Sequence, residues 1–140
     1  MRVRRLSVLL WSVWFGVMAT GCARNPDQEI ESALKDVYAF TGELIKRLES
    51  AADPAVGVDE AQKYLDARKA EIGAKTGVLR KIKDAELSAA TRARKMESLT
   101  DDLMSVNGLQ IRFMTNAMND DAFKSRLEKL LNDYRALIEV

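Results

Sequence analysis

The chain has 140 residues, with 22 Lys and Arg against 21 Asp and Glu, a single cysteine and no histidine. Its length suits one domain, and its balanced charge lacks the basic excess of a nucleic-acid-binding protein. The absence of histidine removes the commonest general base and the usual ligand of haem and of zinc. The composition therefore argues against a bound cofactor and against a catalytic role.

The first 22 residues have the organisation of an export signal. Residues 1–5 hold three arginines and no acid, residues 6–18 are almost entirely apolar, and Ala19-Thr20-Gly21-Cys22 closes the segment with small residues. An apolar run of about a dozen residues has the length of a secretory signal. This segment resembles the bacterial lipoprotein signal, in which cleavage falls directly before a cysteine. The alternatives are an ordinary signal peptide and an uncleaved membrane span, for which the 16 residues from Leu6 to Gly21 are short.

The lipoprotein resemblance implies cleavage between Gly21 and Cys22 and a diacylglycerol on the Cys22 thiol. Membrane lipid would then be a partner, and the protein would face the periplasm or the cell exterior. Ala23 favours the outer membrane over the inner one, because in lipoproteins an aspartate at that position favours inner-membrane retention. The mature chain would have 119 residues, with 19 bases and 21 acids. Residues 22–25 would form the anchor and a short tether, and 26–140 the folded domain.

Apolar residues recur at helical spacing along the whole remaining chain, which predicts an all-α fold. We expect an up-down four-helix bundle with helices at about 26–52, 59–84, 88–118 and 120–139. The alternative is three long, coiled-coil-like helices, with residues 59–118 unbroken. The clearest heptad steps are those of the first and last helices: Ile30, Leu34, Val37, Thr41, Leu44, Leu48 and Ala51, then Phe123, Leu127, Leu130, Tyr134 and Leu137.

Capping residues predict where the first two helices begin. Asn25 precedes Pro26 and is the expected N-cap of the first helix. Because a residue before proline avoids helical geometry, we expect Pro54 to follow the end of that helix, with a loop over 53–58. Asp59 is then the expected N-cap of the second helix.

The signals that separate the later helices are weaker. A turn is expected within residues 83–90 and a slight bend at Asn107-Gly108, while Asn119 to Asp121 should cap the last helix. Gly73 and Gly77 weaken the second helix and predict a close approach of a neighbouring helix.

Two basic segments, Arg80 to Lys83 and Arg92 to Lys95, follow an acidic first helix. They are expected to form a solvated face that pairs with those acids, since exposed pairs of this kind are common. The alternative is contact with anionic lipid headgroups.

The four methionines beyond the signal segment are Met96, Met104, Met114 and Met118. Packing in the core or in an adaptable groove is their expected role. Since thioethers bind Cu(I), a copper site is the alternative.

The sequence also contains two pairs of adjacent acids, Asp101-Asp102 and Asp120-Asp121. Neighbours in sequence point about 100° apart on a helix, so neither pair is expected to form a converging catalytic dyad.

These features predict a lipid-anchored, non-catalytic scaffold or interaction module for another protein of the cell envelope. One alternative is a periplasmic chaperone for unfolded clients, because Leu99-Thr100-Asp101-Asp102-Leu103 resembles the Leu-Thr-x-x-Gln motif of small helical periplasmic chaperones, with Leu103 in place of Gln. A Cu(I) carrier is a further alternative. Heptad seams also pair between chains, so a homo-oligomer is another alternative.

Overall fold

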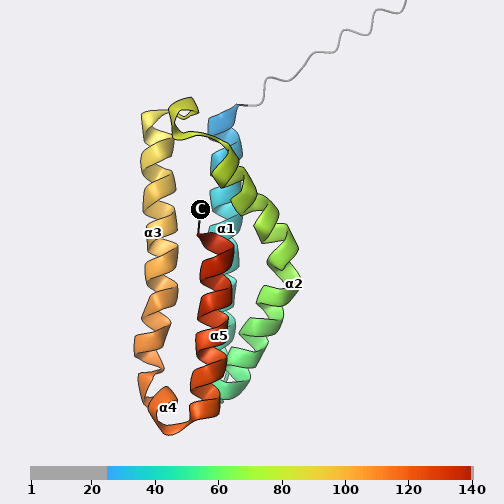
Figure 1. The fold of residues 1–140 in the computed structure, drawn as a ribbon, viewed down its shortest axis with the longest axis vertical. Helices are drawn as coiled ribbons and strands as arrows, with labels where there is room; N and C mark the ends of the chain where they lie inside the picture. Colours follow the sequence, from blue (N-terminus) through green and yellow to red (C-terminus); the bar gives the residue numbers. More distant parts are fainter. Residues whose placement is uncertain (1–24, 140) are drawn as a thin grey trace, which may run out of the picture.

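The computed structural model describes residues 25–139, and these residues form an all-α bundle (Figure 1). No strand occurs within this range. The elements in chain order are α1 (Pro26–Ser50), α2 (Pro54–Lys81), a short 3-10 turn η1 (Asp84–Glu86), α3 (Ala89–Arg112), α4 (Met114–Asn119) and α5 (Asp121–Ile138).

Four long helices, α1, α2, α3 and α5, run alternately up and down, which confirms the predicted bundle (Figure 1). The α-helical structure breaks between Lys81 and Ala89, a segment that overlaps the turn predicted within 83–90, so the alternative with residues 59–118 as one helix is wrong. A fifth, short helix, α4, was not predicted. It joins α3 to α5 at the end of the bundle opposite to the start of α1 (Figure 1).

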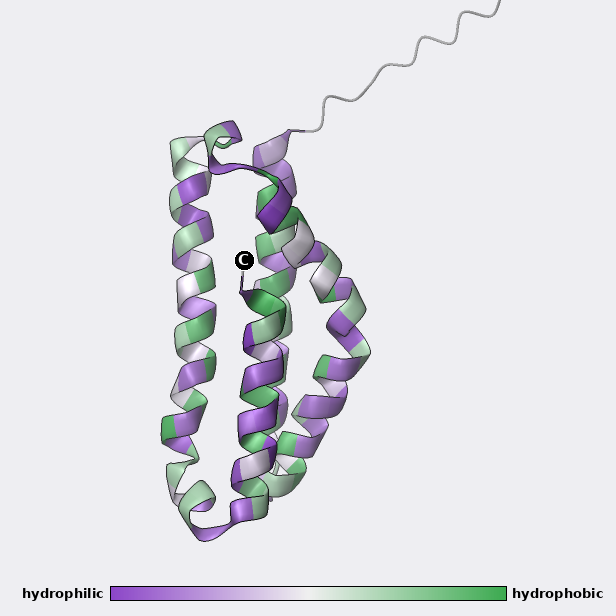
Figure 2. Cartoon of the chain, in the orientation of Figure 1, coloured by the Kyte–Doolittle hydropathy of each residue, from purple (hydrophilic) through white to green (hydrophobic). Residues whose placement is uncertain are grey.

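The core lies mainly between α1, α2 and α5. The Phe40 ring stacks between Tyr64, at 5.4 Å between ring centroids, and Tyr134, at 6.3 Å. The heptad positions predicted for the first and last helices are buried except Ala51, which follows the end of α1 as its C-cap and is half-buried. Each helix also carries hydrophilic residues along its outer side (Figure 2). Burial of apolar side chains contributes roughly 1.5–3 kcal/mol for each large one, so this seam dominates the stability of a chain with no thiol pair.

Helix α3 lies beside α1 and runs in the same direction. Two ion pairs join the two helices. Arg94 pairs with Glu31 near the start of both helices, and Arg112 pairs with Glu49 near the end of both. Val106 and Leu109 are its fully buried apolar residues, whereas Leu99 and Leu103 are only partly covered. The helix is therefore held by a narrower apolar seam than the other long helices.

The predicted caps at Asn25 and Asp120 are confirmed. The Asn25 side chain accepts a hydrogen bond from the Asp27 backbone N–H at 3.1 Å, and Asp120 accepts two, from the Ala122 and Phe123 N–H groups. These bonds satisfy donors at the first turns of α1 and α5 that have no partner within the helix.

The predicted start of the second helix is wrong. The loop was expected over 53–58 with Asp59 as N-cap, but Asp53 caps α2 by accepting from the Ala55 N–H at 2.8 Å. Pro54 does separate the helices, yet it occupies the first position of α2, where its missing N–H costs nothing. Asp59 instead pairs with Arg126 of α5 at 3.0 Å.

The bend expected at Asn107-Gly108 is also misplaced. Helix α3 runs through these residues and is interrupted at Phe113, whose backbone leaves helical geometry. The Phe113 ring packs against Phe123 at 6.0 Å between centroids, so the interruption coincides with a contact to α5. The change of direction lets α4 lead the chain back into the bundle.

The close helix approach is at Gly57, a position that the sequence placed in a loop. A Cβ atom there would lie 2.4 Å from the carbonyl oxygen of Leu48 in α1. At Gly77 a Cβ would meet nothing within 4 Å, and at Gly73 only Leu137 at 3.7 Å, an ordinary contact. The approach predicted at Gly73 and Gly77 is therefore wrong.

Replacing Gly57 by Ala should lower the free energy of unfolding by about 1–3 kcal/mol, because the new methyl group meets rigid backbone. Gly77→Ala is the matched control and should raise it by up to about 1 kcal/mol, since alanine is the better helix former. Urea denaturation followed by circular dichroism measures both. Equal effects of the two substitutions would contradict the close packing of α1 on α2.

Candidate functional site

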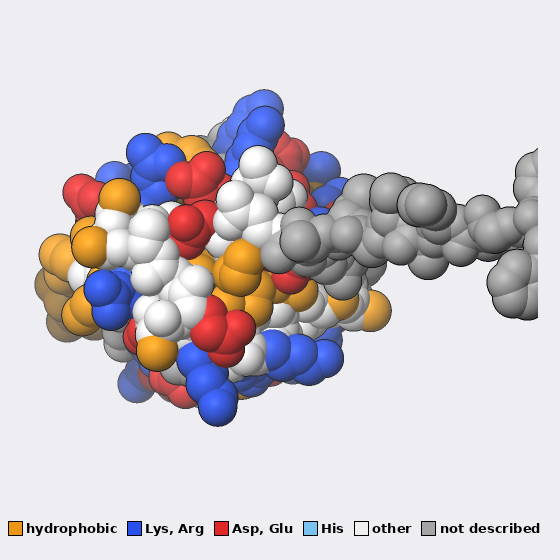
Figure 3. All heavy atoms as spheres, turned by 90° about the horizontal axis from the view of Figure 1, so that it is seen from above, with side chains coloured by type: hydrophobic (Ala, Val, Ile, Leu, Met, Phe, Trp, Pro, Cys, Tyr) orange, Lys and Arg blue, Asp and Glu red, His pale blue; other side chains and the backbone are white. Residues whose placement is uncertain are grey.

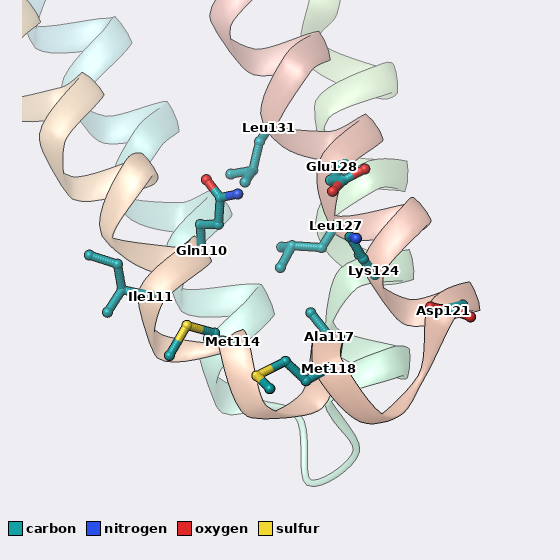
Figure 4. Close-up of a pocket in the computed structure, with 10 residues that line it drawn as sticks. All are labelled: Gln110, Ile111, Met114, Ala117, Met118, Asp121, Lys124, Leu127, Glu128 and Leu131. Carbon is teal, nitrogen blue, oxygen red and sulfur yellow. The ribbon is translucent and has the colours of Figure 1, made fainter.

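An open groove lies between the end of α3, α4 and the first half of α5. Its volume is about 460 Å³, and its lining is mostly apolar. The apolar lining residues are Ile111, Met114, Ala117, Met118, Leu127 and Leu131, and the polar ones are Gln110, Asp121, Lys124 and Glu128 (Figure 4). We call this feature the methionine groove.

The groove has a buried floor and an exposed wall. Leu127 and Leu131 of α5 are buried and form the floor. On the opposite wall the exposed fractions are 76% for Ile111, 56% for Met114 and 78% for Met118. Large apolar side chains left in water beside a groove mark a binding surface more often than scattered single ones do.

Helical geometry explains why these side chains face outward. On α3, Val106 and Leu109 point into the core, and Ile111, two residues beyond Leu109, points about 200° away from it. Met114 and Met118 follow the interruption at Phe113 and lie one helical turn apart on α4. Figure 4 shows both sulfur atoms on the α4 side of the groove.

The methionines were expected to pack in the core or in a groove, and none of the four lies in the core. The exposed fractions are 75% for Met96 and 68% for Met104, and Met114 and Met118 are also exposed. The groove alternative is confirmed for Met114 and Met118 only, because Met96 lines a separate recess with Asp84, Arg92 and Leu99.

The four methionines do not converge on one point. Met96 and Met104 are eight residues apart on the same helix, a rise of about 12 Å, so they cannot share an ion. Only Met114 and Met118 lie one turn apart. Among residues 25–139 no group of three or more Asp, Glu, Cys or His side chains could hold a metal ion.

Sequence reasoning missed a buried carboxylate. Asp102 on α3 is only 3% exposed, and its Oδ2 atom has no hydrogen-bond partner within the described residues. Burial, with a smaller effect of the neighbouring Asp101 charge, raises the pKa of Asp102 to about 6. A signal was present, because Asp102 lies four residues before Val106 and seven before Leu109, on the same helical stripe.

The interior also contains a hydroxyl pair. The Thr41 and Tyr134 hydroxyls lie 2.7 Å apart, and the Thr41 hydroxyl donates to the Val37 carbonyl at 3.0 Å, so Tyr134 is the donor to Thr41. Burial, with a smaller effect of the Asp102 charge, raises the pKa of Tyr134. A neutral phenol in this setting stabilises the core and does not act as a base.

The three tyrosines differ in exposure. Tyr64 is half-buried, Tyr134 is fully buried and Tyr38 is 66% exposed. The Arg47 guanidinium lies over the Tyr64 ring at 4.5 Å from its centroid, which covers the edge of the core.

The signal segment, the cleavage site at Gly21 and the lipidation site at Cys22 lie outside the described residues. Within them, no helix is both long and apolar enough to cross a membrane.

Fold and surface together define a four-helix bundle with an exposed apolar groove at one end. No protein-family model, curated protein sequence or solved structure matches the chain.

Proposed function

We propose that this protein is a lipid-anchored, non-catalytic interaction module of the cell envelope and that it binds a partner protein through the methionine groove. The groove is the observation that carries the proposal, since Ile111, Met114 and Met118 remain exposed above a buried leucine floor. The resemblance of the first 22 residues to a lipoprotein signal supports the location, with the anchor on Cys22 and the outer membrane favoured.

The arrangement of the two ends suits this role. Cys22 precedes the first described residue, Asn25, by three positions, and the methionine groove lies at the other end of the bundle. Helix α1 has 25 residues and spans about 38 Å. A protein anchored through Cys22 would therefore present the groove well away from the membrane surface.

An amphipathic helix is the expected ligand of the groove. Its walls are two helices with apolar side chains at one-turn spacing, which fits the helix-in-groove mode of recognition. Asp121, Lys124 and Glu128 provide a polar rim of mixed charge. Contact with charged residues that flank an apolar stripe would fix the orientation of the ligand.

Binding of unfolded clients is the second candidate, because methionine side chains adapt to differently shaped ligands. The two candidates differ in what the groove holds in cells: one defined protein for the scaffold, many unrelated proteins for the chaperone. Suppression of aggregation of a model unfolded protein at equimolar amounts separates them further. A second copy of the chain and a Cu(I) ion held by Met114 and Met118 are the remaining alternatives.

Substituting Met114 and Met118 with Glu should abolish partner capture, because two buried carboxylates in an apolar interface cost several kcal/mol. Met96→Glu with Met104→Glu is the matched control, since these methionines are equally exposed but lie outside the groove. A photoreactive residue at Ile111 in intact cells, followed by mass spectrometry, measures capture.

Loss of a single crosslinked partner in the groove variant alone would support the scaffold. Capture of many proteins would favour the chaperone, and capture of the chain itself a homo-oligomer. Identical capture by both double variants would contradict the proposed role of the groove.

A further inference from the structure

The end of the bundle at which α1 begins brings two basic segments together. The link between α2 and α3 folds over the start of α1, where the Ser88 N–H donates to Asp27 at 3.0 Å. Arg94 pairs with Glu31 on the same face of α1. Residues 80–95 carry six bases and two acids, and this whole segment lies at the same end of the bundle as the start of α1 (Figure 1).

Some of these bases are neutralised within the protein. Arg94 pairs with Glu31 at 3.2 Å, and Lys95 pairs with Asp84 at 3.1 Å. The expected pairing of the basic segments with acids is thus confirmed for Arg94 against α1. Glu86 is exposed on the same link and adds one negative charge.

Four bases at this end have no ion-pair partner in the part of the chain that the structure describes, and all four are exposed: Arg80, Lys81, Lys83 and Arg92. Figure 3 looks onto this end and shows Lys and Arg side chains around its rim, with acidic side chains between them. We call these four residues the proximal basic patch.

The tether brings this patch close to any membrane that holds Cys22. Cys22 lies three positions before Asn25, and such a segment spans at most about 11 Å. The Debye length at physiological ionic strength is about 8 Å, so the potential of an anionic surface is weakened over this maximum span but not abolished, and it grows as the tether shortens. The tether also keeps the local lipid concentration high, so that weak contacts are populated.

We infer that the proximal basic patch is a docking surface for anionic phospholipid headgroups and that it orients the anchored bundle with α1 rising from the membrane. The inference rests on the proposed anchoring through Cys22. Each basic residue near such a surface strengthens attraction by about fivefold, so four of them suffice to select one orientation of a tethered domain. The methionine groove would then face away from the lipid.

The test couples the chain to vesicles chemically and does not depend on whether cells attach lipid to it. A chain beginning at Cys22 retains every core residue, since these lie between Ile30 and Ile138, and Cys22 is its only thiol. That thiol is joined to a maleimide phospholipid in vesicles of phosphatidylcholine, with or without phosphatidylglycerol. Acylation rates of individual lysines are then measured by mass spectrometry.

Lys81 and Lys83 should be acylated about threefold or more slowly on the anionic vesicles than on the neutral ones. The difference should vanish at about 1 M NaCl, where the Debye length falls to about 3 Å. Lys46 and Lys124, exposed near the opposite end, are internal controls and should react equally on both vesicles.

Arg80→Glu combined with Arg92→Glu should remove the slowing, while Lys46→Glu combined with Lys63→Glu, two exposed positions outside both the patch and the groove, should leave it intact. Equal rates of Lys81 and Lys83 on the two kinds of vesicle, or equal slowing of Lys46 and Lys124, would overturn the inference. Failure of the anchoring itself is a separate result, since it would appear as an unmodified Cys22 in protein from native cells.

Discussion

Replacing Asp102 by Asn should raise the free energy of unfolding at pH 7 by about 1–3 kcal/mol, which would make the protein more stable than the native chain. Burial raises the pKa of Asp102 from 3.8 to about 6, so at pH 7 the folded protein holds an ionised carboxylate without a hydrogen bond to Oδ2. A shift of this size corresponds to about 3 kcal/mol in favour of the protonated form. Asn has the same shape and carries no charge.

The stability of the native chain should fall as the pH rises from about 4 to about 6. In this window the folded protein keeps a proton that the unfolded chain has released, so each increment of pH favours unfolding. Once the folded protein has also released this proton, above about pH 6, Asp102 lowers the free energy of unfolding no further. The Asp102→Asn variant should lack this decrease.

Urea denaturation at a series of pH values measures both effects, with Asp101→Asn as the matched control. Asp101 is exposed, and its removal should change the stability by no more than about 0.5 kcal/mol. A variant at Asp102 that is less stable than the native chain at pH 7, or that keeps the same dependence on pH, would show that the carboxylate is solvated or paired in solution.

Changing Cys22 to Ser should remove all incorporation of fatty acid into the protein. The proposed anchor needs a thiol, because the lipid is attached through a thioether, and a serine hydroxyl does not replace it. One acyl chain holds a protein to a membrane only marginally, whereas two or more hold it firmly. Loss of all acyl chains should therefore release the protein from the membrane. Labelling cells with a radioactive fatty acid measures the incorporation.

Ala23→Ser is the control for this experiment, because it alters the adjacent residue and keeps the thiol. It should incorporate fatty acid at the level of the native chain. Equal labelling of the Cys22→Ser variant and the native protein would place any lipid elsewhere in the chain and remove the basis for the proposed anchor.

The parts of the fold that were predicted correctly follow from short sequence patterns that are compatible with only one local structure. The heptad steps from Phe123 to Leu137 leave a helix only one way to bury its apolar stripe, and each of those positions is buried. The Asn25 and Asp120 caps followed for the same reason, since an acceptor before a helical run meets unpaired N–H groups.

The start of α2 was missed because proline has two opposite effects on helix boundaries. It ends a helix at the preceding residue, and it also suits the first position of a new one. Both apply at Pro54, where Asp53 is the cap and α2 starts at once. The early start places Gly57 in α2 against Leu48 of α1, a tertiary contact that the sequence does not display.

The site could be predicted only in part, because α3 has apolar residues on more than one face. Val106 and Leu109 take the core side, which turns Met104 and Ile111 toward solvent, and the interruption at Phe113 then places Met118 beside α5. No local rule selects the buried face of such a helix. Asp102 was missed for the same reason, since a charged residue is expected on the exposed face.

The most direct test of the account is the intact mass of the protein extracted from the membranes of its native cells. The account predicts a chain that begins at Cys22, lacks residues 1–21 and carries the added mass of a diacylglycerol with or without a further acyl chain. A chain that retains residues 1–21 with an unmodified thiol at Cys22 would contradict it.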